Sequence, residues 1–359
     1  MDADLRSILI TGGAGFVGCR LARELVDSGA EVLVLDSLHP QVHTTSGRPA
    51  ALPDEATLWP VDVTDAGAWD AVFKLVRPSA IVHLAAETGT AQSLREGSRH
   101  GRVNVVGTTE LLDALSRADH VPDHLVLSST RAVYGEGEWE ADGERYYPAV
   151  RRHDDLACGR WDPAAPSGAA GRPLPSVAGT TRPEPTSVYG ATKLAQEHVL
   201  RAWGAATGCP VSILRCQNIY GVGQSLTNPY TGVLSLFARL ALAGETLPVY
   251  EDGKIVRDFV YVADVVSALA AALASPPPDL RTLDIGSGTS TTIGDVARAL
   301  AAIADAPAPK VTGQFRDGDV RAASCRVDDA VVDLGYAPTW DLERGLNAVM
   351  EWVGSDMGV

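Results

Sequence analysis

The stretch Ile8-Leu9-Ile10-Thr11-Gly12-Gly13-Ala14-Gly15-Phe16-Val17-Gly18 determines the fold. Its apolar start predicts a buried strand, and its glycines predict a tight turn that leads directly into a helix. Two glycine spacings fit this turn, one through Gly12 and the other through Gly13, each followed by Gly15 and Gly18. Glycine is needed where φ is positive or where the backbone touches a pyrophosphate, and a helix N-terminus offers free N–H groups to phosphates. The stretch therefore predicts a dinucleotide site.

An acidic residue, Asp36, ends the next predicted strand, 31–36. A carboxylate at this offset accepts hydrogen bonds from the adenosine ribose hydroxyls and repels a 2′-phosphate. No Arg or Lys follows at positions 37–40, so we expect the cofactor to be NAD rather than NADP. Asp62 and Val63, after the third predicted strand, are expected to meet the edge of the adenine.

The composition limits the kinds of partner. The 359 residues carry a formal net charge of −15, which argues against nucleic acid, because phosphate backbones need a basic surface. A few local arginines can still hold a small diphosphate. The five cysteines form no CxxC pair, which favours reduced thiols in a cytoplasm and offers no framework for a metal. The acidic start of the chain is unlike a signal peptide, and the longest apolar run, 260–274, is too short to span a bilayer. We therefore expect a cytoplasmic protein without a membrane partner.

Short apolar strands alternate with helical stretches through the first two-thirds of the chain. This alternation predicts an α/β fold with a doubly wound parallel sheet, Rossmann-like, whose ligand crevice lies at the carboxyl ends of the strands. The expected strands are 7–11, 31–36, 58–63, 80–84, 124–129 and 211–214, and the expected helices are 17–28, 66–76, 103–117 and 189–207.

Two regions interrupt this alternation. Residues 136–186 are rich in Gly, Pro and charge and show no sustained periodicity, so we expect an insertion at the mouth of the active site, acting either as a lid or as a surface excursion without a role. We expect an NAD-binding domain over 1–216 and a smaller substrate-binding lobe over 217–359. Within that lobe, 257–285 is expected to return to the main sheet.

A tyrosine and a lysine, Tyr189 and Lys193, stand four residues apart at the start of a strong helix, so both project from one face. A nearby ammonium and the positive nicotinamide ring of NAD would lower the pKa of the phenol and make it a usable base. The strand expected over 124–129 ends in Ser128-Ser129-Thr130. These hydroxyls lie at a carboxyl-end strand tip, where such folds place reactive groups.

Together these motifs resemble the extended short-chain dehydrogenase/reductase family, and within it the nucleotide-sugar epimerases and dehydratases. The resemblance covers almost the whole chain apart from 136–186. The stretches that carry it are 11–18, His83-Leu84-Ala85-Ala86, Ser128-Ser129-Thr130 with Val133-Tyr134-Gly135, and Tyr189-Gly190-Ala191-Thr192-Lys193.

The resemblance implies a role for each matching residue. Tyr189 would take the proton from a sugar hydroxyl while the carbon gives hydride to nicotinamide. Thr130 would bind the same hydroxyl, and Lys193 would hold the nicotinamide ribose and lower the pKa of the tyrosine. The expected cofactor-binding residues are Gly12, Gly15, Phe16, Val17, Gly18, Asp36, Asp62, Val63, Leu84, Ala85, Ala86, Asn104, Ser128, Tyr189 and Lys193.

On the substrate side the resemblance implies contacts to a nucleotide diphosphate from Asn218, Arg257 and Arg321. The segment after the fourth strand, with Thr88 and Thr90, is expected to face the sugar together with Thr130. Gln224–Thr231 is expected to grip the nucleotide.

The residues after Thr130 separate the possible reactions. Dehydratases of the family place an Asp-Glu pair there, whereas this chain has Arg131 and Ala132, which cannot serve as carboxylic acid and base. The resemblance then implies 4-epimerisation, by transient oxidation at C4 and return of the hydride from tightly bound NADH. A 2-epimerase and a 4-keto-sugar reductase or 4,6-dehydratase stay open as alternatives.

The substrate and the assembly are also implied only by resemblance. The segments around the expected sugar site are most similar to the dTDP-L-rhamnose 4-epimerase branch and next to UDP-glucose 4-epimerases, so a dTDP- or UDP-sugar is expected. Relatives commonly dimerise through two helices, which correspond here to 103–117 and 189–207, so we expect a homodimer.

Overall fold

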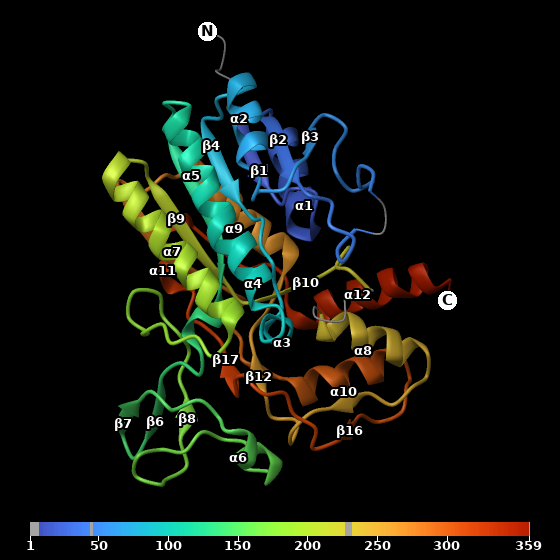
Figure 1. Ribbon diagram of the computed structural model, residues 1–359. Helices are drawn as coiled ribbons and strands as arrows, with labels where there is room; N and C mark the ends of the chain where they lie inside the picture. Colours follow the sequence, from blue (N-terminus) through green and yellow to red (C-terminus); the bar gives the residue numbers. More distant parts are fainter. Residues whose placement is uncertain (1–6, 44–45, 227–231, 359) are drawn as a thin grey trace.

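A seven-stranded, wholly parallel sheet forms the centre of the computed structural model, which describes residues 7–43, 46–226 and 232–358 (Figure 1). In sheet order the strands are β14 (Leu280–Ile285), β9 (Val211–Cys216), β5 (His124–Thr130), β4 (Ala80–His83), β1 (Ser7–Thr11), β2 (Glu31–Asp36) and β3 (Thr57–Pro60). From β1 the strand order proceeds to one edge through β2 and β3, and from β4 to the other edge through β5, β9 and β14. The order reverses between β1 and β4, and ligand crevices open at such a switch point. The predicted doubly wound α/β class is confirmed.

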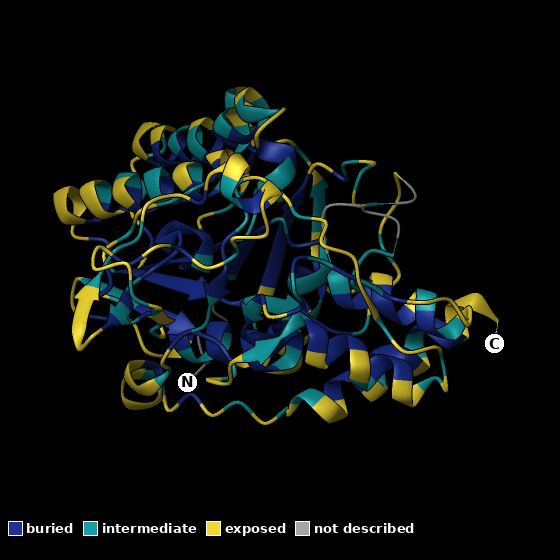
Figure 2. Ribbon diagram, turned by 90° about the horizontal axis from the view of Figure 1, so that it is seen from below, coloured by how far each residue is buried: buried dark blue, intermediate teal, exposed yellow. Residues whose placement is uncertain are grey.

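Helices cover both faces of this sheet. One face carries α2 (Ala66–Leu75), α5 (Gly107–Arg117) and α7 (Val188–Thr207), and the other carries α1 (Phe16–Asp27), α9 (Val262–Ala274) and α11 (Asp328–Leu334). Along β1, Leu9 packs into the core under the first layer, while Ile8 and Ile10 pack into the core under the second. Because a strand buried on both faces needs apolar residues at every position, the continuous run Ile8-Leu9-Ile10 fits a central parallel strand. Figure 2 shows the buried strands between the helices.

Between β4 and α5 the chain makes three short helical segments. They are α3 (Thr90–Ser93), α4 (Gly97–His100) and a π-helical segment η1 (Gly101–Val106), which continues into α5. The helix expected to begin at residue 103 therefore begins earlier, at Gly97. The wider turn of η1 interrupts the period of 3.6 on which that expectation depended.

The smaller lobe follows β9. Its helices α8 (Val233–Leu242), α10 (Ile293–Ile303) and α12 (Leu342–Met357) pack together and share one core with α1 and α9. Its strands are short and form three small sheets: β10 (Asn218–Tyr220) with β13 (Phe259–Tyr261), β11 (Pro248–Val249) with β16 (Lys310–Val311), and β12 (Val256–Arg257) between β15 (Thr291–Thr292) and β17 (Ala322–Ala323). No helix among the described residues is long and apolar enough to span a membrane.

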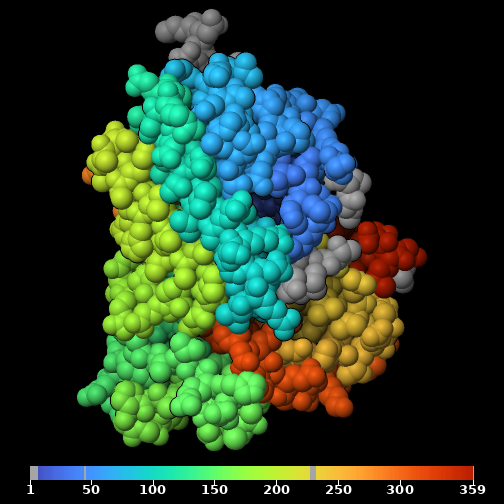
Figure 3. Space-filling view, viewed as in Figure 1, coloured from blue at the N-terminus to red at the C-terminus, as the bar shows by residue number. Residues whose placement is uncertain are grey.

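The insertion, 136–186, differs from its expectation. It contains a small antiparallel sheet in which β6 (Trp139–Ala141) lies between β7 (Glu144–Tyr146) and β8 (Arg172–Pro173). A short helix, α6 (His153–Ala157), lies between β7 and β8 in the chain. Strands of two or three residues are too short to produce a visible alternation, which is why the sequence showed no periodicity. In Figure 3 the green insertion borders the orange-red segment before α11, well below the glycine turn.

The third strand also ends earlier than expected, at Pro60 rather than Val63. The side chain of Asp62 accepts hydrogen bonds from the backbone N–H and the hydroxyl of Thr64 (2.8 and 2.9 Å). This local turn takes the chain out of the extended conformation.

Candidate active site

A cleft of about 1870 Å³ opens at the carboxyl ends of the strands. Its walls come from the glycine turn, the ends of β2, β4, β5 and β9, the start of α7 and the first part of the lobe. The described residues 136–186 contribute nothing to this wall. The insertion instead packs against the segment before α11, and four of its residues line a small hollow that they share with Arg131: Glu136, Gly137, Leu174 and Ser176.

Two positions of the glycine turn leave no room for a side chain. Gly12 has a φ of +67°, and a Cβ there would lie 2.7 Å from the backbone nitrogen of Ala85. A Cβ at Gly18 would lie 2.5 Å from the Cα of Gly13. Such contacts would displace backbone, so only glycine permits this turn to lie against β4. The first turn of α1 meets the cleft here, with the unpaired N–H groups that every helix start presents. The turn fits the diphosphate of a dinucleotide.

The acidic tip of β2 lies beside this turn. The buried carboxylate of Asp36 accepts hydrogen bonds from the backbone N–H groups of Ala14 (3.1 Å) and Leu38 (2.9 Å). These bonds fix the carboxylate at the cleft wall. Asp62 and Val63 line the same end of the cleft, so the residues expected to hold the adenosine half lie together.

The three residues expected to be catalytic also meet at the cleft. Ser187 caps α7 by accepting a hydrogen bond from the backbone N–H of Gly190 (3.1 Å), which fixes where the helix begins and hence where Tyr189 stands. Thr130 ends β5, and its hydroxyl is hydrogen-bonded to Tyr189. Burial raises the pKa of the Tyr189 phenol, while the Thr130 hydrogen bond and the charge of Arg131 act to lower it.

Lys193 lies one turn further along α7 and is 1 % exposed. Burial lowers the pKa of its ammonium to about 8, against the opposing charge of Glu197. Its Nζ donates a hydrogen bond to the side-chain oxygen of Gln196. The ammonium is thus held inside the protein by a neutral acceptor.

A series of hydrogen-bonded, buried side chains connects Gln196 to β1, the strand that leads into the glycine turn. Gln196 donates to the hydroxyl of Thr108 (2.7 Å), Thr108 lies 3.0 Å from Nε2 of His83, and Nδ1 of His83 lies 2.7 Å from the hydroxyl of Thr11. Burial, with the charge of Lys193, lowers the pKa of His83 to about 3, so this histidine is neutral. The sequence analysis missed Gln196 and Thr108, because no spacing rule pairs residues so far apart in the chain.

Asn104 lies off the cleft wall. Its amide accepts from the backbone N–H of Glu87 (2.8 Å) and donates to the Glu87 carbonyl (3.0 Å) and to the hydroxyl of Thr192 (3.0 Å). Asn104 thus connects the segment after β4 to α7, between Tyr189 and Lys193. The π-helical turn that contains Asn104 buries this amide completely.

The expected substrate residues fall into two groups. Thr88, Thr90, Thr130 and Asn218 line the cleft, as do the cofactor-side residues Gly15, Phe16, Val17, Leu84, Ala85, Ala86 and Ser128. Of the segment expected to grip the nucleotide, Gln224, Ser225 and Leu226 line the cleft, and 227–231 lie outside the described residues.

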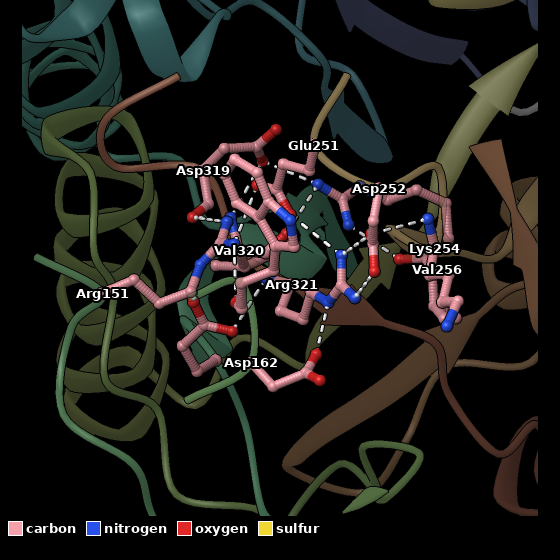
Figure 4. Close-up of polar contacts among 12 residues, drawn as sticks. Arg151, Asp162, Glu251, Asp252, Lys254, Val256, Asp319, Val320 and Arg321 are labelled. Atoms are coloured by element: carbon pink, nitrogen blue, oxygen red, sulfur yellow. Dashed lines mark hydrogen bonds and ion pairs between the residues drawn. The ribbon is translucent and has the colours of Figure 1, made fainter. Parts of the chain in front are cut away.

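Arg257 and Arg321 form the second group and do not line the cleft. Arg257 is ion-paired with Asp319 at 2.7 Å and donates to two backbone carbonyls. Arg321 contacts carboxylates of Asp162, Glu251 and Asp252 at 2.7 to 2.9 Å. Figure 4 shows Arg321 surrounded by these carboxylates. Both guanidinium groups are therefore occupied by acidic residues, which the sequence expectation did not foresee.

The sequence matches the NAD dependent epimerase/dehydratase family over residues 8–152 and 164–286, and the chain belongs to this family. A dTDP-L-rhamnose 4-epimerase of Burkholderia thailandensis is 52% identical over 356 residues, which make up 99% of this chain and 96% of the relative. The family resemblance inferred from the motifs is confirmed, and the cofactor is NAD.

Two solved structures share the fold over nearly the full chain. The UDP-glucose 4-epimerase of Thermotoga maritima with UDP-glucose has a TM-score of 0.78 at 29% identity and covers 98% of this chain and 99% of its own. The UDP-glucose 4-epimerase of Thermus thermophilus in complex with NAD has a TM-score of 0.76 at 28% identity and covers 97% and 98%.

Proposed function

We propose that the protein is a nucleotide-sugar 4-epimerase that keeps NAD bound through each catalytic cycle. The observation that carries this proposal is the meeting of Thr130, Tyr189 and Lys193 at one cleft, with Arg131 and Ala132 where a dehydratase has its acid pair. The cofactor would lie along the glycine turn. Its adenosine half would contact Asp36, Asp62 and Val63, and its nicotinamide half would lie near Ser128, Tyr189 and Lys193.

The protein's own groups would carry the proton. Tyr189 takes the proton from the sugar C4 hydroxyl, and Thr130 holds that hydroxyl in line with the phenol. Lys193 holds the nicotinamide ribose, and its positive charge stabilises the phenolate. When bound, NAD supplies the hydride chemistry, accepting hydride from C4 and returning it to the opposite face. Asn104 positions α7 through Thr192 rather than contacting the cofactor.

The carboxylates at the cleft support epimerisation over dehydration. Elimination of the 6-hydroxyl needs one carboxylic acid and one base beside the sugar, and Arg131 and Ala132 provide neither. Glu87 does line the cleft, but Arg99 holds its carboxylate at 2.7 Å. This carboxylate is therefore already engaged by a guanidinium.

The substrate we propose is a dTDP- or UDP-linked hexose, with dTDP-L-rhamnose tested first. The 52% identity to a dTDP-L-rhamnose 4-epimerase supports the dTDP-sugar, and the likeness to UDP-glucose 4-epimerase structures supports the second choice. The residues expected to hold the sugar and its diphosphate, Asn218, Thr88 and Thr90, line the same cleft as Thr130.

One NMR assay tests the reaction. Purified protein is incubated with dTDP-L-rhamnose, and in parallel with UDP-glucose and GDP-, CDP- and ADP-sugars, without added NAD. We expect a pair of C4 epimers to interconvert for one of the first two substrates. Accumulation of a 4-keto-6-deoxy sugar, inversion at C2, or consumption of added NADH would replace this function with a dehydratase, a 2-epimerase or a reductase.

We further propose that the enzyme works as a homodimer in the cytoplasm. Support for the dimer is that α5 and α7 pack side by side on one outer face of the sheet (Figure 1), so they offer a pair of parallel ridges to a second copy. Support for the compartment is that all five cysteines, each of them described, are free thiols. Light scattering that reports a monomer at working concentration would overturn the dimer.

A further inference from the structure

Arg131 occupies a place in the cleft that neither its neighbours nor the catalytic scheme explains. It begins the single turn η2 (Arg131–Tyr134), directly after Thr130. The Thr130 hydroxyl accepts a hydrogen bond from the backbone N–H of Ala132 (3.2 Å), which fixes this turn at the end of β5. The half-buried Arg131 side chain lines the cleft, and its Nε donates to the side-chain oxygen of Asn218 (2.9 Å).

This guanidinium has no counterion in contact with it. Within 7–43, 46–226 and 232–358, its one hydrogen bond goes to a neutral amide, and no carboxylate lies at ion-pair distance. Loss of hydration and the like charge of Arg257 lower the pKa of Arg131 to about 10, and the carboxylates of Asp319 and Glu136 oppose this shift only through their charge. Taking an unpaired cation even partly out of water is unfavourable.

Two other arginines near Arg131 have carboxylate partners, whereas it has none among the described residues. Arg257 has Asp319 and Arg99 has Glu87 as ion-pair partners, each at 2.7 Å. Arg20 donates to the carbonyl of Val222 on the cofactor side (2.7 Å), and Lys193 stands with the catalytic tyrosine. Arg131 is therefore a cation next to Thr130 that can accept an anion without first releasing a carboxylate.

We propose that Arg131 binds the sugar-bearing phosphate of a nucleoside diphosphate sugar, with Asn218 orienting its guanidinium. This assignment rests on the proposed function for the identity of the ligand. The position next to Thr130 brings the guanidinium close enough to Tyr189 for their charges to interact. A hexose whose C4 hydroxyl meets Tyr189 has its phosphate across one sugar ring. The planar fork of arginine suits this role, because it can bind phosphate with its terminal nitrogens while Nε stays on Asn218.

The assignment also explains why so costly a residue stands there. In the absence of ligand the half-buried, unpaired charge is unfavourable, and a bound phosphate would relieve this cost. Replacement of Arg131 should therefore leave the ligand-free protein as stable or make it more stable, while ligand binding weakens. A residue with a merely structural role would behave in the opposite way.

Calorimetry on the NAD-loaded protein tests the proposal. The proteins are the wild type, Arg131→Gln and Arg131→Lys, with Arg172→Gln as a matched control, since Arg172 is an exposed arginine of the insertion that pairs with Glu140. The probes are dTDP, UDP and thymidine. We expect Arg131→Gln to weaken dTDP and UDP binding about 10- to 100-fold, as loss of a charge-assisted hydrogen bond does, and to leave thymidine binding unchanged. Arg131→Lys should recover part of the loss, and Arg172→Gln should match the wild type.

Thermal unfolding and kinetics complete the test. The melting temperature of ligand-free Arg131→Gln should equal or exceed that of the wild type, and the rise in melting temperature on adding dTDP should shrink. An unchanged Kd for both nucleotides, or a lowered melting temperature without ligand, would overturn the assignment. It would also fall if Arg131→Gln lowered kcat and left KM unchanged, because Arg131 would then act on the chemical step rather than on phosphate binding.

The same measurements separate this assignment from the proposed function. Loss of diphosphate binding in Arg131→Gln, in a protein that epimerises none of the sugars tested, would support the phosphate site and reject the 4-epimerase. Epimerisation with undiminished diphosphate binding in Arg131→Gln would do the reverse.

Discussion

The ammonium of Lys193 donates its hydrogen bond to Gln196, three residues ahead on the same helix, and not to a carboxylate. Glu197, the next residue along, points its carboxylate to Arg215 (2.7 Å) and Ser129 instead. Within the described residues, the ammonium of Lys193 therefore contacts a neutral amide and no carboxylate. Gln196 holds that charge in place without cancelling it.

Replacing Gln196 with Leu should slow the reaction through Lys193. The change removes the acceptor of the ammonium, which lowers the pKa of Lys193 further and weakens its support of the Tyr189 phenolate. We expect kcat to fall about 10-fold, the cost of one hydrogen bond to a charged group, and the acid limb of the kcat profile to move to higher pH. A lower kcat with an unmoved pH profile would indicate a packing defect instead.

Tyr189→Phe should reduce turnover by several orders of magnitude, because the phenol is the proposed base. NAD should stay bound, since the substitution removes one hydroxyl and leaves the glycine turn intact. Turnover and cofactor content are both measurable on the purified protein. Tyr147→Phe is the matched control, because the Tyr147 hydroxyl bonds only to the backbone N–H of Arg182 within the described insertion. A fully active Tyr189→Phe would remove this residue from the mechanism.

Gly18→Ala should abolish NAD binding or folding. The new Cβ would lie 2.5 Å from the Cα of Gly13, and a backbone contact of this kind cannot relax by moving a side chain. Gly101→Ala is the control, because a Cβ there meets nothing within 4 Å, and alanine favours the helical backbone by about 0.5–1 kcal/mol. Retained NAD and an unchanged melting temperature in Gly18→Ala would contradict the geometry of the turn.

Acid should destabilise the protein through His83. Its pKa is lowered to about 3 in the folded state and is near 6.5 in the unfolded chain, so the unfolded state binds the proton first. The stability it contributes is present above pH 6.5 and is lost as the pH falls. At pH 5 the loss relative to pH 7 is about 2 kcal/mol, from 1.36 kcal/mol per pKa unit.

The comparison of wild type with His83→Gln isolates this contribution. The free energy of unfolding, measured in urea at pH 5 and pH 7, should fall by less in the variant. His124 is also buried, with a pKa lowered to about 4, and its contribution is common to both proteins. Equal falls in the two proteins would show that His83 does not titrate as its surroundings demand.

The sequence motifs of the cofactor-binding region predicted its strands and turns correctly, because each motif depends on neighbouring residues. The glycine turn, the acidic end of β2 and the start of α7 each depend on residues within a few positions of one another. The expected strands 7–11 and 31–36 agree with β1 and β2 residue for residue. Parallel strands buried on both faces show continuous apolar runs, and these runs are visible without knowledge of the partners.

Predictions that depended on distant partners were less complete. The surroundings of Arg321 come from Asp162, Glu251 and Asp252, in two other segments, and no spacing in the sequence brings these together. In the sequence, Arg131 is noticeable only because it stands where the dehydratases of the family have an acidic residue. Its place in the cleft depends on Asn218, 87 positions away. The short strands of the insertion were invisible because each depends on its neighbours for hydrogen bonds.

The insertion is held by residues that lie far later in the sequence. The backbone N–H of Arg321 donates to the carboxylate of Glu136, 185 positions earlier, and Arg151 reaches the carbonyl of Asp319. On the ribosome, residues 136–186 emerge long before these anchors exist, and contacts of such long range form slowly. The contacts that hold the insertion can therefore be completed only after residues 319–321 have been made. A chain released before residue 319 would leave Arg151 and Glu136 without these partners.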